Sequence, residues 1–372
     1  MSRRLAQEII LPADYSSPLY LRTVVRACRD GLRVFVRRLQ TDQPPTTTDL
    51  KRLGSAGRRQ AELGVPLEVL LRAYRLAAKV VWEEAIAESL QGIEISPSAL
   101  LNMTAQVLEY LDEISVLVGQ AYLETREENV RQRERDRERV LQRLIAGDAS
   151  DDVRRLAASC DLELSPPYDV AVVATEDTLS DRMFMKACQL VSGIFVALGP
   201  HRWAALIPQG DGADRMTRDL LVQGKVEGSR FTFGISHGAY ELSDVARVAR
   251  WAERSLDTGL ILRPKARVHQ FSELGIFASL SRQGEVASPF VAQLMGRLAT
   301  STTLRDDAMR ASLAMYLETG NIAVAATRLG IHRHTMVYRL ARLNEILPVD
   351  LQDPVQQHLL WVALQLHRLQ TA

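Results

Sequence analysis

The segment from residue 124 to residue 139, ETREENVRQRERDRER, is almost wholly charged. It cannot bury a hydrophobic core, because charged side chains are rarely found in protein interiors. Acidic and basic residues are interleaved, so that residues four positions apart on a helix can form ion pairs. We interpret the segment as a solvated helix that bridges two domains. A parallel signalling helix at a dimer axis is the alternative, although the apolar positions between Val130 and Ile145 are too few for a heptad repeat.

The length and composition of the chain fit a protein of several globular domains. A chain of 372 residues favours two or three domains, and 47% apolar with 24% charged residues is typical of folded proteins. The formal net charge is only +1. Binding to nucleic acid would therefore require a local basic surface, because the whole protein exerts no general attraction on polyanions.

The three cysteines, Cys28, Cys160 and Cys188, are isolated and odd in number. Neither a disulfide framework nor a thiolate metal site is indicated, and a reducing cytosol fits this pattern. The N-terminal sequence contains an apolar stretch that is too short for a signal peptide, and no later run approaches the length of a membrane span. We therefore expect a cytoplasmic protein.

Residues 1–123 are predicted to form a helical bundle. Long apolar stripes at helical spacing run through residues 63–89 and 98–124, with Pro66 near the start of the first helix. The charged segment then continues the chain as a linker helix over residues 124–146.

Residues 147–279 differ from the rest of the chain because they contain strands. The buried-type strands YDVAVVAT, IFVALG and RWAALIP are followed by RFTFGISHG and RVHQF, with helical segments after the first, third and fourth strands. This order is typical of a split βαβ or ferredoxin-like α+β domain, and we expect an antiparallel sheet that is covered by helices. After a loop around residues 281–289 the chain is helical, which gives a C-terminal domain over residues 280–372.

The centre of the C-terminal domain, GNIAVAATRLGIHRHTMVYRLARL in residues 320–343, contains two short helices joined at a glycine. Asn321 is suited to cap the first helix, and Gly330 ends it. The apolar stripe of the second helix consists of Met336, Val337, Leu340 and Leu343. The pattern fits a helix-turn-helix whose second helix enters the major groove of DNA, and it equally fits a helical hairpin with a solvated polar face.

The polar residues at the start of the second helix match the chemistry of DNA. Arg333 can donate two hydrogen bonds to a guanine, and Thr335 can contact a phosphate or a thymine methyl group. Either His332 or His334 can donate a hydrogen bond to a base or a phosphate. The sequence therefore places candidate base-reading residues where the second helix begins.

Further along the helix, Arg339 and Arg342 are suited to lie against phosphates. The positive electrostatic field of the C-terminal domain is weak, because residues 301–372 contain seven arginines and six acidic residues. A dimer that reads two half-sites would be needed for useful affinity. His332 and His334 are two positions apart and point in different directions on a helix, so we expect no shared metal site.

The C-terminal region resembles the helix-turn-helix of the PucR or CdaR family of bacterial transcriptional regulators. The resemblance covers about the last seventy residues and includes Gly320, Asn321, His332, Arg333, Thr335, Tyr338, Arg339 and Leu340. His334 stands where the family commonly has asparagine, and Val337 where it often has a polar residue, so the preferred DNA sequence does not carry over. The resemblance implies that double-stranded DNA is bound by Asn321, His332, Arg333, His334, Thr335, Tyr338, Arg339 and Arg342.

The upstream regions resemble other domains of the same family. The central region resembles a degenerate GGDEF-like domain, in which a nucleotide cyclase would need carboxylates after the first strand and in the hairpin between the second and third. Glu176 or Asp177 follows the first strand, but the hairpin formed by residues 199–202 contains no acid. The resemblance therefore implies a dimerisation or transmission module. The N-terminal helices are similar to RsbR-like domains, which implies that they sense a signal.

Together these features predict a mainly α-helical, multidomain bacterial transcription regulator that binds DNA. We expect it to be homo-oligomeric, as a dimer or larger, and to respond to an unknown small-molecule or protein effector. We expect no catalytic residues, cofactor, metal site or membrane contact. The alternative is a signalling adaptor whose output is protein binding through the RsbR-like bundle, and the intact polar recognition helix favours the regulator.

Overall fold

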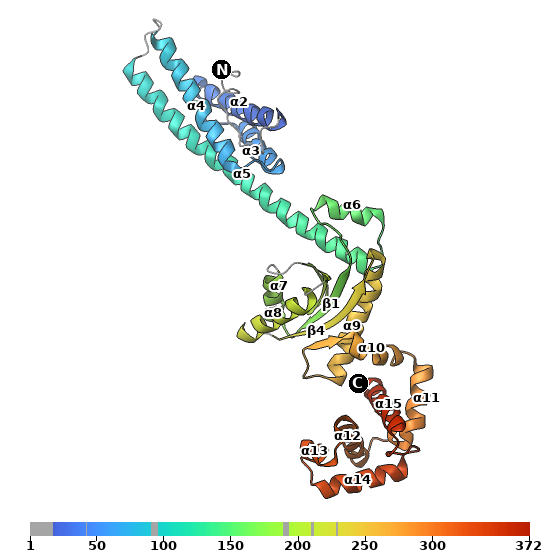
Figure 1. The fold of residues 1–372 in the computed structure, drawn as a ribbon. Helices are drawn as coiled ribbons and strands as arrows, with labels where there is room; N and C mark the ends of the chain where they lie inside the picture. The colour runs from blue at the N-terminus through green and yellow to red at the C-terminus, as the bar shows by residue number, and fades with distance from the viewer. Residues whose placement is uncertain (1–17, 42, 91–95, 189–192, 210–211, 228–229) are drawn as a thin grey trace. The chain divides into compact units, whose positions relative to one another are not determined.

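The computed structural model describes residues 18–372 except 42, 91–95, 189–192, 210–211 and 228–229. The described chain is mainly helical around one five-stranded sheet, as the sequence predicts (Figure 1). It divides into two compact units, Met1–Arg135 and Asp136–Ala372. The interpretation of the first seventeen residues lies outside the described part of the chain. None of the described helices combines the length and the apolarity that crossing a bilayer requires.

The described residues of the first unit form a bundle of four helices. They are α2 (Pro18–Thr41), α3 (Thr47–Glu62), α4 (Leu67–Leu90) and the N-terminal part of α5 (Pro97–Ile145). Pro66 directly precedes α4, where its fixed backbone angle suits a helix start. Each helix contributes to one apolar core, for example through Val24, Leu53, Leu70 and Ile114.

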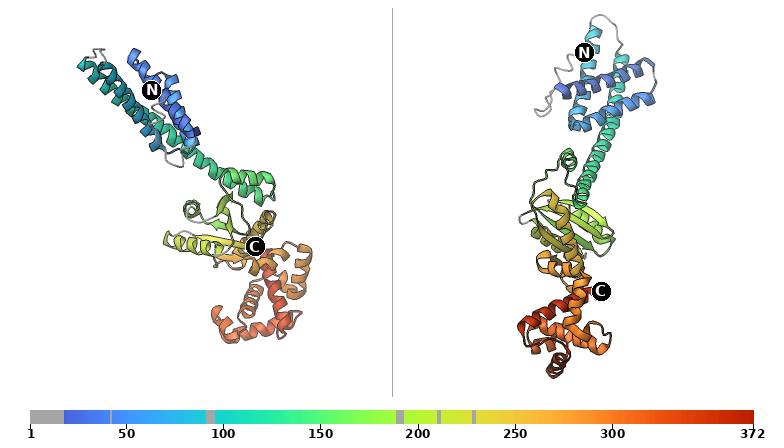
Figure 2. Two further views of the ribbon diagram at one scale, coloured as in Figure 1. Left: turned by 45° about the horizontal axis from the view of Figure 1, so that its top comes forward. Right: turned by 90° about the vertical axis from the view of Figure 1, so that its right-hand side faces the viewer.

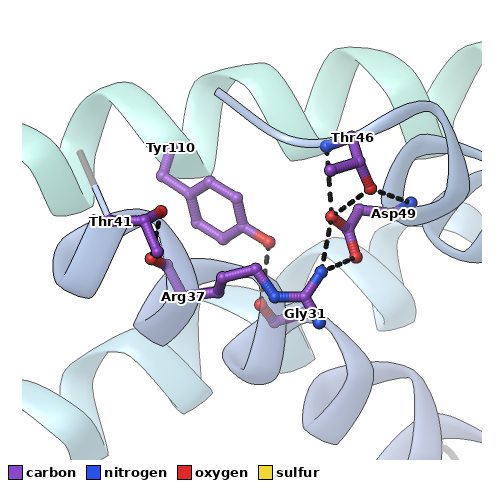
Figure 3. Close-up of polar contacts among 6 residues, drawn as sticks. All are labelled: Gly31, Arg37, Thr41, Thr46, Asp49 and Tyr110. Atoms are coloured by element: carbon purple, nitrogen blue, oxygen red, sulfur yellow. Dashed lines mark hydrogen bonds and ion pairs between the residues drawn. The ribbon is translucent and has the colours of Figure 1, made fainter. Parts of the chain in front are cut away.

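Close helix packing in the bundle depends on a glycine in α3. A Cβ atom at Gly57 would lie only 2.4 Å from the carbonyl oxygen of Val118 in α5, so any larger residue would push the two helices apart. On the same helix α5, the Tyr110 hydroxyl donates a 2.8 Å hydrogen bond to the carbonyl oxygen of Gly31 in α2 (Figure 3). Both contacts fix α5 against its neighbours.

The N-terminus of α3 is held by a polar network (Figure 3). Thr46 and Asp49 form a capping box, in which each side chain accepts a hydrogen bond from the backbone N–H of the other residue. The Thr46 hydroxyl also donates to the carboxylate at 2.6 Å, and Nη1 of Arg37 in α2 lies 2.9 Å from both carboxylate oxygens. Although Asp49 is only 2% exposed, these donors, the Thr46 hydroxyl foremost, hold the pKa of its carboxyl below the ordinary value.

The charged segment predicted as a linker forms the C-terminal part of α5 and is continuous with the bundle helix. Its side chains pair along the helix as expected, for example Arg131 with Glu127 at 3.3 Å. The expectation of a solvated helix as far as residue 146 is wrong for the last turns. Val140, Leu141 and Leu144 are at most 1% exposed, because they pack into the core of the second unit.

After the last turns of α5, the second unit continues with α6 (Asp151–Ser159) and a five-stranded sheet. Its elements are β1 (Tyr168–Thr175), α7 (Thr178–Cys188), β2 (Ile194–Gly199), β3 (Arg202–Pro208), α8 (Gly212–Glu227), β4 (Phe231–Ala239), η2 (Leu242–Asp244), α9 (Val245–Leu262) and β5 (Val268–Gln270). The strand order is β2-β3-β1-β4-β5, which confirms the split βαβ pattern. The sheet is not wholly antiparallel, because the crossover helix α9 returns the chain so that β5 runs parallel to β4.

Helices cover both faces of this sheet (Figures 1 and 2). Val170 and Val172 of β1 face a core formed with α5, α6 and α9, whereas Ala171 and Val173 face a core formed with α7 and α8. This alternation follows the two-residue period of a strand. The unbroken apolar run of β1 is therefore explained by burial on two sides.

The C-terminal part of the second unit is helical. Its elements are α10 (Phe271–Leu280), α11 (Gly284–Met295), η3 (Gly296–Ala299), α12 (Leu304–Thr319), α13 (Ile322–Arg328), α14 (Arg333–Ile346) and α15 (Pro354–Thr371). The loop predicted around residues 281–289 is mostly wrong, because α11 begins at Gly284 and contains Pro289. The buried stripe of Ala287, Val291 and Met295 outweighs the hydrogen bond that this proline cannot donate.

The acid dependence of stability tests the network at Asp49. Because its pKa is lower in the folded than in the unfolded state, its stabilisation is complete above the unfolded pKa and is lost as the pH falls through the folded pKa. We expect Asp49→Asn to lower the free energy of unfolding at pH 7 by about 1–3 kcal/mol. Urea titrations at several pH values should show this difference shrink on acidification. Glu109→Gln is the control, since Glu109 is 63% exposed in its pair with Arg38; an equal effect of both variants would contradict this account.

Candidate nucleic-acid interface

The turn between α13 and α14 is built from local backbone hydrogen bonds. Asn321 caps α13, with Oδ1 accepting from the backbone N–H groups of Ala323 and Val324 at 2.9 and 3.1 Å. At the other end, Gly330 adopts φ +65° and donates to the carbonyl of Thr327, while Ile331 donates to that of Ala326. This pair of bonds is a Schellman motif, which requires a left-handed residue and therefore favours glycine.

The predicted recognition helix α14 begins at Arg333, and His332 is its N-cap. The Nδ1 atom of His332 accepts from the backbone N–H of His334 at 3.3 Å, so a neutral His332 ring keeps Nε2–H as an outward donor. The expectation that the two histidines point in different directions is wrong, because His332 lies outside the helix. Their rings stack with centroids 5.2 Å apart.

One face of α14 packs against the preceding helices. Met336 and Leu343 are 0% exposed, and Met336 lies against Ala325 and Ala326 of α13. Val337, predicted in the same stripe, is instead 44% exposed. It follows Met336 directly, and one residue turns an α-helix by about 100°, which places it on the outer face. Counting from Met336 at helical spacing would have revealed this.

The outer face of α14 brings together most of the predicted site residues. His332, Arg333, His334 and Thr335 are all exposed at the N-terminal end of the helix. Val337, which the apolar pattern assigned to the buried stripe, instead joins Tyr338, 63% exposed, on this surface. Arg342 is also exposed and pairs with Glu345 three residues later. The result is a continuous face of donors, hydroxyl groups and one branched apolar side chain.

Two predicted residues have contacts that the sequence did not reveal. Arg339 turns inward, and its Nη1 donates to Oγ of Ser312 in α12 at 3.0 Å. Ser312 is 0% exposed and donates in turn to the carbonyl of Ala308, so the arginine ties α14 to α12. Asn321 has Oδ1 committed to its helix cap and keeps only its amide nitrogen for another partner. These geometries indicate positioning roles for both residues.

The C-terminal helix connects this region to the α+β domain within the second unit. α15 begins at Pro354 with Asp353 as its N-cap, as predicted. Near its end, Nη2 of Arg368 lies 3.2 Å from the carbonyl oxygen of Ile261 at the end of α9. Trp361 of α15 packs edge to face on Phe277 of α10, with ring centroids 5.3 Å apart. The helix-turn-helix is thereby attached to the layer that covers the sheet.

In the α+β domain, both acidic residues after β1 have structural partners. Asp177 accepts a 2.7 Å hydrogen bond from the backbone N–H of Ser180 near the start of α7. Glu176 pairs with Arg267 at 3.3 Å and with Arg230 at 3.7 Å. Among the described residues, no group of three or more acidic, histidine or cysteine side chains is placed to hold a metal ion.

Three known domain families match the chain in order. Residues 3–137 match the RsbT co-antagonist protein rsbRD N-terminal domain, residues 146–258 match the GGDEF-like domain, and residues 309–366 match the PucR C-terminal helix-turn-helix domain. The chain thus combines these three domain types, and its C-terminal domain is a PucR-type helix-turn-helix. The helix-turn-helix geometry of α13 and α14 is therefore that of a PucR-type domain, and the sheet described above lies in its GGDEF-like domain.

Relatives of the chain carry regulatory names. It is 31% identical over 140 residues to the purine catabolism regulatory protein of Bacillus subtilis, covering 37% of this chain and 26% of that protein. It is 29% identical over 161 residues to the carbohydrate diacid regulator of Escherichia coli, covering 42% of this chain and 41% of the relative. The transcriptional activator PmfR of Paenarthrobacter nicotinovorans is 28% identical over 204 residues, covering 54% of this chain and 40% of the relative. The chain thus spans less than half the length of each of these relatives.

Among solved structures, the chain is similar to the crystal structure of a regulator of polyketide synthase expression from Bifidobacterium adolescentis. The TM-score is 0.32 and the sequence identity 16%, with 64% of this chain and 94% of that chain covered.

The inward contact of Arg339 gives a stability prediction. Removing its hydrogen bond to the buried Ser312 should lower the free energy of unfolding of the second unit by about 1–2 kcal/mol in Arg339→Ala. Arg342→Ala is the matched control and should change it by less than about 0.5 kcal/mol, since the Arg342 pair is exposed. Denaturant unfolding of both variants and of Ser312→Ala measures these changes in the free energy of unfolding. Additive losses in the Arg339→Ala/Ser312→Ala double variant would show that the two residues are not coupled.

Proposed function

We propose that the chain is a transcription regulator that inserts α14 into the major groove of double-stranded DNA. The observation that carries this proposal is the exposed, polar N-terminal end of α14 in a PucR-type helix-turn-helix. A recognition helix of this motif contacts base edges with its N-terminal residues. The regulatory names of the relatives support the same class of function.

The exposed side chains of α14 suggest a division of roles. Arg333, which has no hydrogen bond or ion pair among the described residues, is suited to the two acceptors of a guanine. The Nε2–H of His332 lies at the helix N-terminus, where phosphate binding is favoured. Thr335 and Val337 offer methyl groups for a thymine. Tyr338 and Arg342 are assigned to the phosphate backbone.

An exposed apolar stripe on α5 suggests how two copies pair. Leu101, Leu108, Val116, Leu123 and Val130 are each between 53% and 73% exposed. Successive members are seven or eight residues apart, two turns of helix, so they lie on one side of α5. Exposed apolar stripes of this kind mark protein interfaces. We assign the stripe to a homodimer, which would supply the second recognition helix that the weakly charged domain needs.

The continuity of α5 suggests the route of a signal. Its N-terminal part belongs to the bundle, which we assign to input over residues 1–123, and its last turns belong to the core of the α+β domain. We assign the intervening charged linker to residues 124–139. The last turns of α5 and residues 147–279 are assigned to the GGDEF-like domain, and residues 280–372 to the DNA-binding domain. A signal in the bundle would change the separation of the two recognition helices. Equal separations with and without the effector, measured by spin-label distances, would contradict this route.

We further propose that the GGDEF-like domain is not an enzyme and that the protein works in the cytoplasm without a cofactor. The pairing of Glu176 with two arginines and the acid-free hairpin at residues 199–202 support this assignment. Turnover of GTP in the presence of magnesium would contradict it. None of the comparisons supports the adaptor alternative.

The role of Arg333 can be tested on DNA. Arg333→Ala should weaken binding to the preferred sequence by about 1–3 kcal/mol and leave binding to unrelated DNA nearly unchanged, because it would remove a base contact. Arg342→Ala is the comparison: loss of a phosphate contact should weaken both DNAs alike and reduce the salt dependence of binding. Fluorescence anisotropy at several salt concentrations measures both effects. Equal losses on both DNAs for Arg333→Ala would remove its assigned role.

The dimer can be tested separately from DNA. Leu108→Glu combined with Leu123→Glu should convert the dimer to monomers in sedimentation equilibrium, because two charges would be buried in the interface. Val222→Glu is the matched control, since Val222 is 59% exposed on α8 and is not part of the stripe. A wild-type monomer, or a double variant that remains dimeric, would contradict the assignment of the stripe.

A further inference from the structure

A basic hollow lies between α2 and α3, the two adjacent bundle helices seen in Figure 1. Its volume is about 660 Å³, within the range of small-molecule sites. We call it the arginine groove, and the arginines that line it are Arg22, Arg26, Arg29, Arg33, Arg52 and Arg59. The one acidic residue of its lining, Asp30, lies 3.6 Å from Arg33. The other five arginines have no carboxylate partner among the described residues.

The spacing of these arginines is costly for the isolated helix. Arg22, Arg26, Arg29 and Arg33 recur at three or four residues and so line one face of α2. Like charges at this spacing repel each other. In the charged segment of α5 the same spacing pairs opposite charges, as in Glu127 and Arg131. The arrangement on α2 therefore presents a concentrated positive field to the groove, which a bound anion would neutralise.

The lining of the groove also includes a buried amide with no partner. Gln60 of α3 is 0% exposed, and neither Oε1 nor Nε2 has a hydrogen bond among the described residues. Buried amides normally find a partner, because leaving one unpaired costs the free energy of its lost hydration. The amide can donate two hydrogen bonds and accept others from a ligand that enters the groove.

We propose that the arginine groove binds a small anion that carries two or more phosphate or carboxylate groups. Guanidinium groups match the geometry of both, and several guanidinium groups around one hollow require a ligand of multiple charge. The apolar cavity inside the bundle holds only about 30 Å³, roughly one water molecule, and does not compete as an effector site. Double-stranded DNA is a weaker candidate, because a rigid duplex cannot enter a hollow of about 660 Å³.

The anion would act as the effector of the regulator, and in this respect the inference rests on the proposed function. Its site is formed by two helices that share their core with α5. Binding would draw α2 and α3 together by neutralising their arginines, and so alter how both helices pack on α5. Binding itself requires no DNA, so it can be measured whether or not the protein is a DNA-binding regulator.

The test is isothermal titration calorimetry of the full chain with pyrophosphate and, separately, with citrate. One saturable site is expected. Tighter binding of pyrophosphate would indicate a phosphate ligand, and tighter binding of citrate would indicate a carboxylate ligand. The double substitution Arg26→Gln and Arg59→Gln should lower the affinity for the tighter-binding probe by about tenfold or more. Arg75→Gln, an exposed arginine on α4 outside the groove, is the matched control and should leave the affinity unchanged.

Gln60→Met separates binding from folding. This variant replaces an unpaired buried amide by an apolar side chain of similar size. The melting temperature should therefore stay the same or rise, while the affinity for the probe should fall. Absence of saturable binding at millimolar probe, or unchanged affinity in the double arginine variant, would overturn the proposal. Loss of affinity for DNA of any sequence in that variant, without probe binding to the wild type, would instead identify a polyanion surface and also overturn it.

Discussion

The continuity of α5 is the constraint on which the other features of the protein depend. One helix of 49 residues supplies core residues to the bundle at its N-terminal end and to the α+β domain at its C-terminal end. Burial of Val140, Leu141 and Leu144 contributes roughly 1.5–3 kcal/mol each relative to exposure, so the last turns are firmly part of the second unit. Between these ends, pairs such as Glu127 with Arg131 support a helix that has no core of its own.

The recognition helix is held by short-range interactions and a few small residues. Ala325 and Ala326 allow α13 to approach Met336 closely, while the Schellman motif at Gly330 and the cap at His332 set where α14 begins. Arg339 adds a hydrogen bond between α14 and α12. With these contacts on the inner side, the outer side of the helix remains exposed. A rigid inner face is what allows a few exposed residues to read a sequence.

Local patterns predicted the elements well, because each depends on nearby residues. The strand YDVAVVAT begins and ends as β1 does, and the Asp-Pro start of α15 is confirmed. Contacts between distant residues were not predictable in the same way. The inward bond of Arg339 depends on Ser312, which lies 27 residues earlier and carries no pattern that points to it. The parallel pairing of β5 likewise follows from the path of α9 rather than from the composition of the strand.

The exposure of the candidate site residues follows from the sequence, whereas their contacts follow from it only in part. Arg333, His334 and Thr335 are exposed together because the helix period places them at its free end. The apolar pattern assigned Val337 to the wrong face. The arginine groove does not follow from the sequence, because its six arginines come from two helices that only the fold brings together. The net charge of +1 conceals this local concentration of positive charge.

The most direct test of the account is binding of the purified full chain to DNA from immediately upstream of its own coding region. An unrelated fragment of equal length is the comparison, and both are measured at two salt concentrations. The account predicts preferential binding to the upstream fragment that persists at the higher salt, because base contacts depend less on salt than phosphate contacts do. Equal binding to both fragments that disappears together at higher salt, or no binding at either, would contradict a sequence-specific regulator.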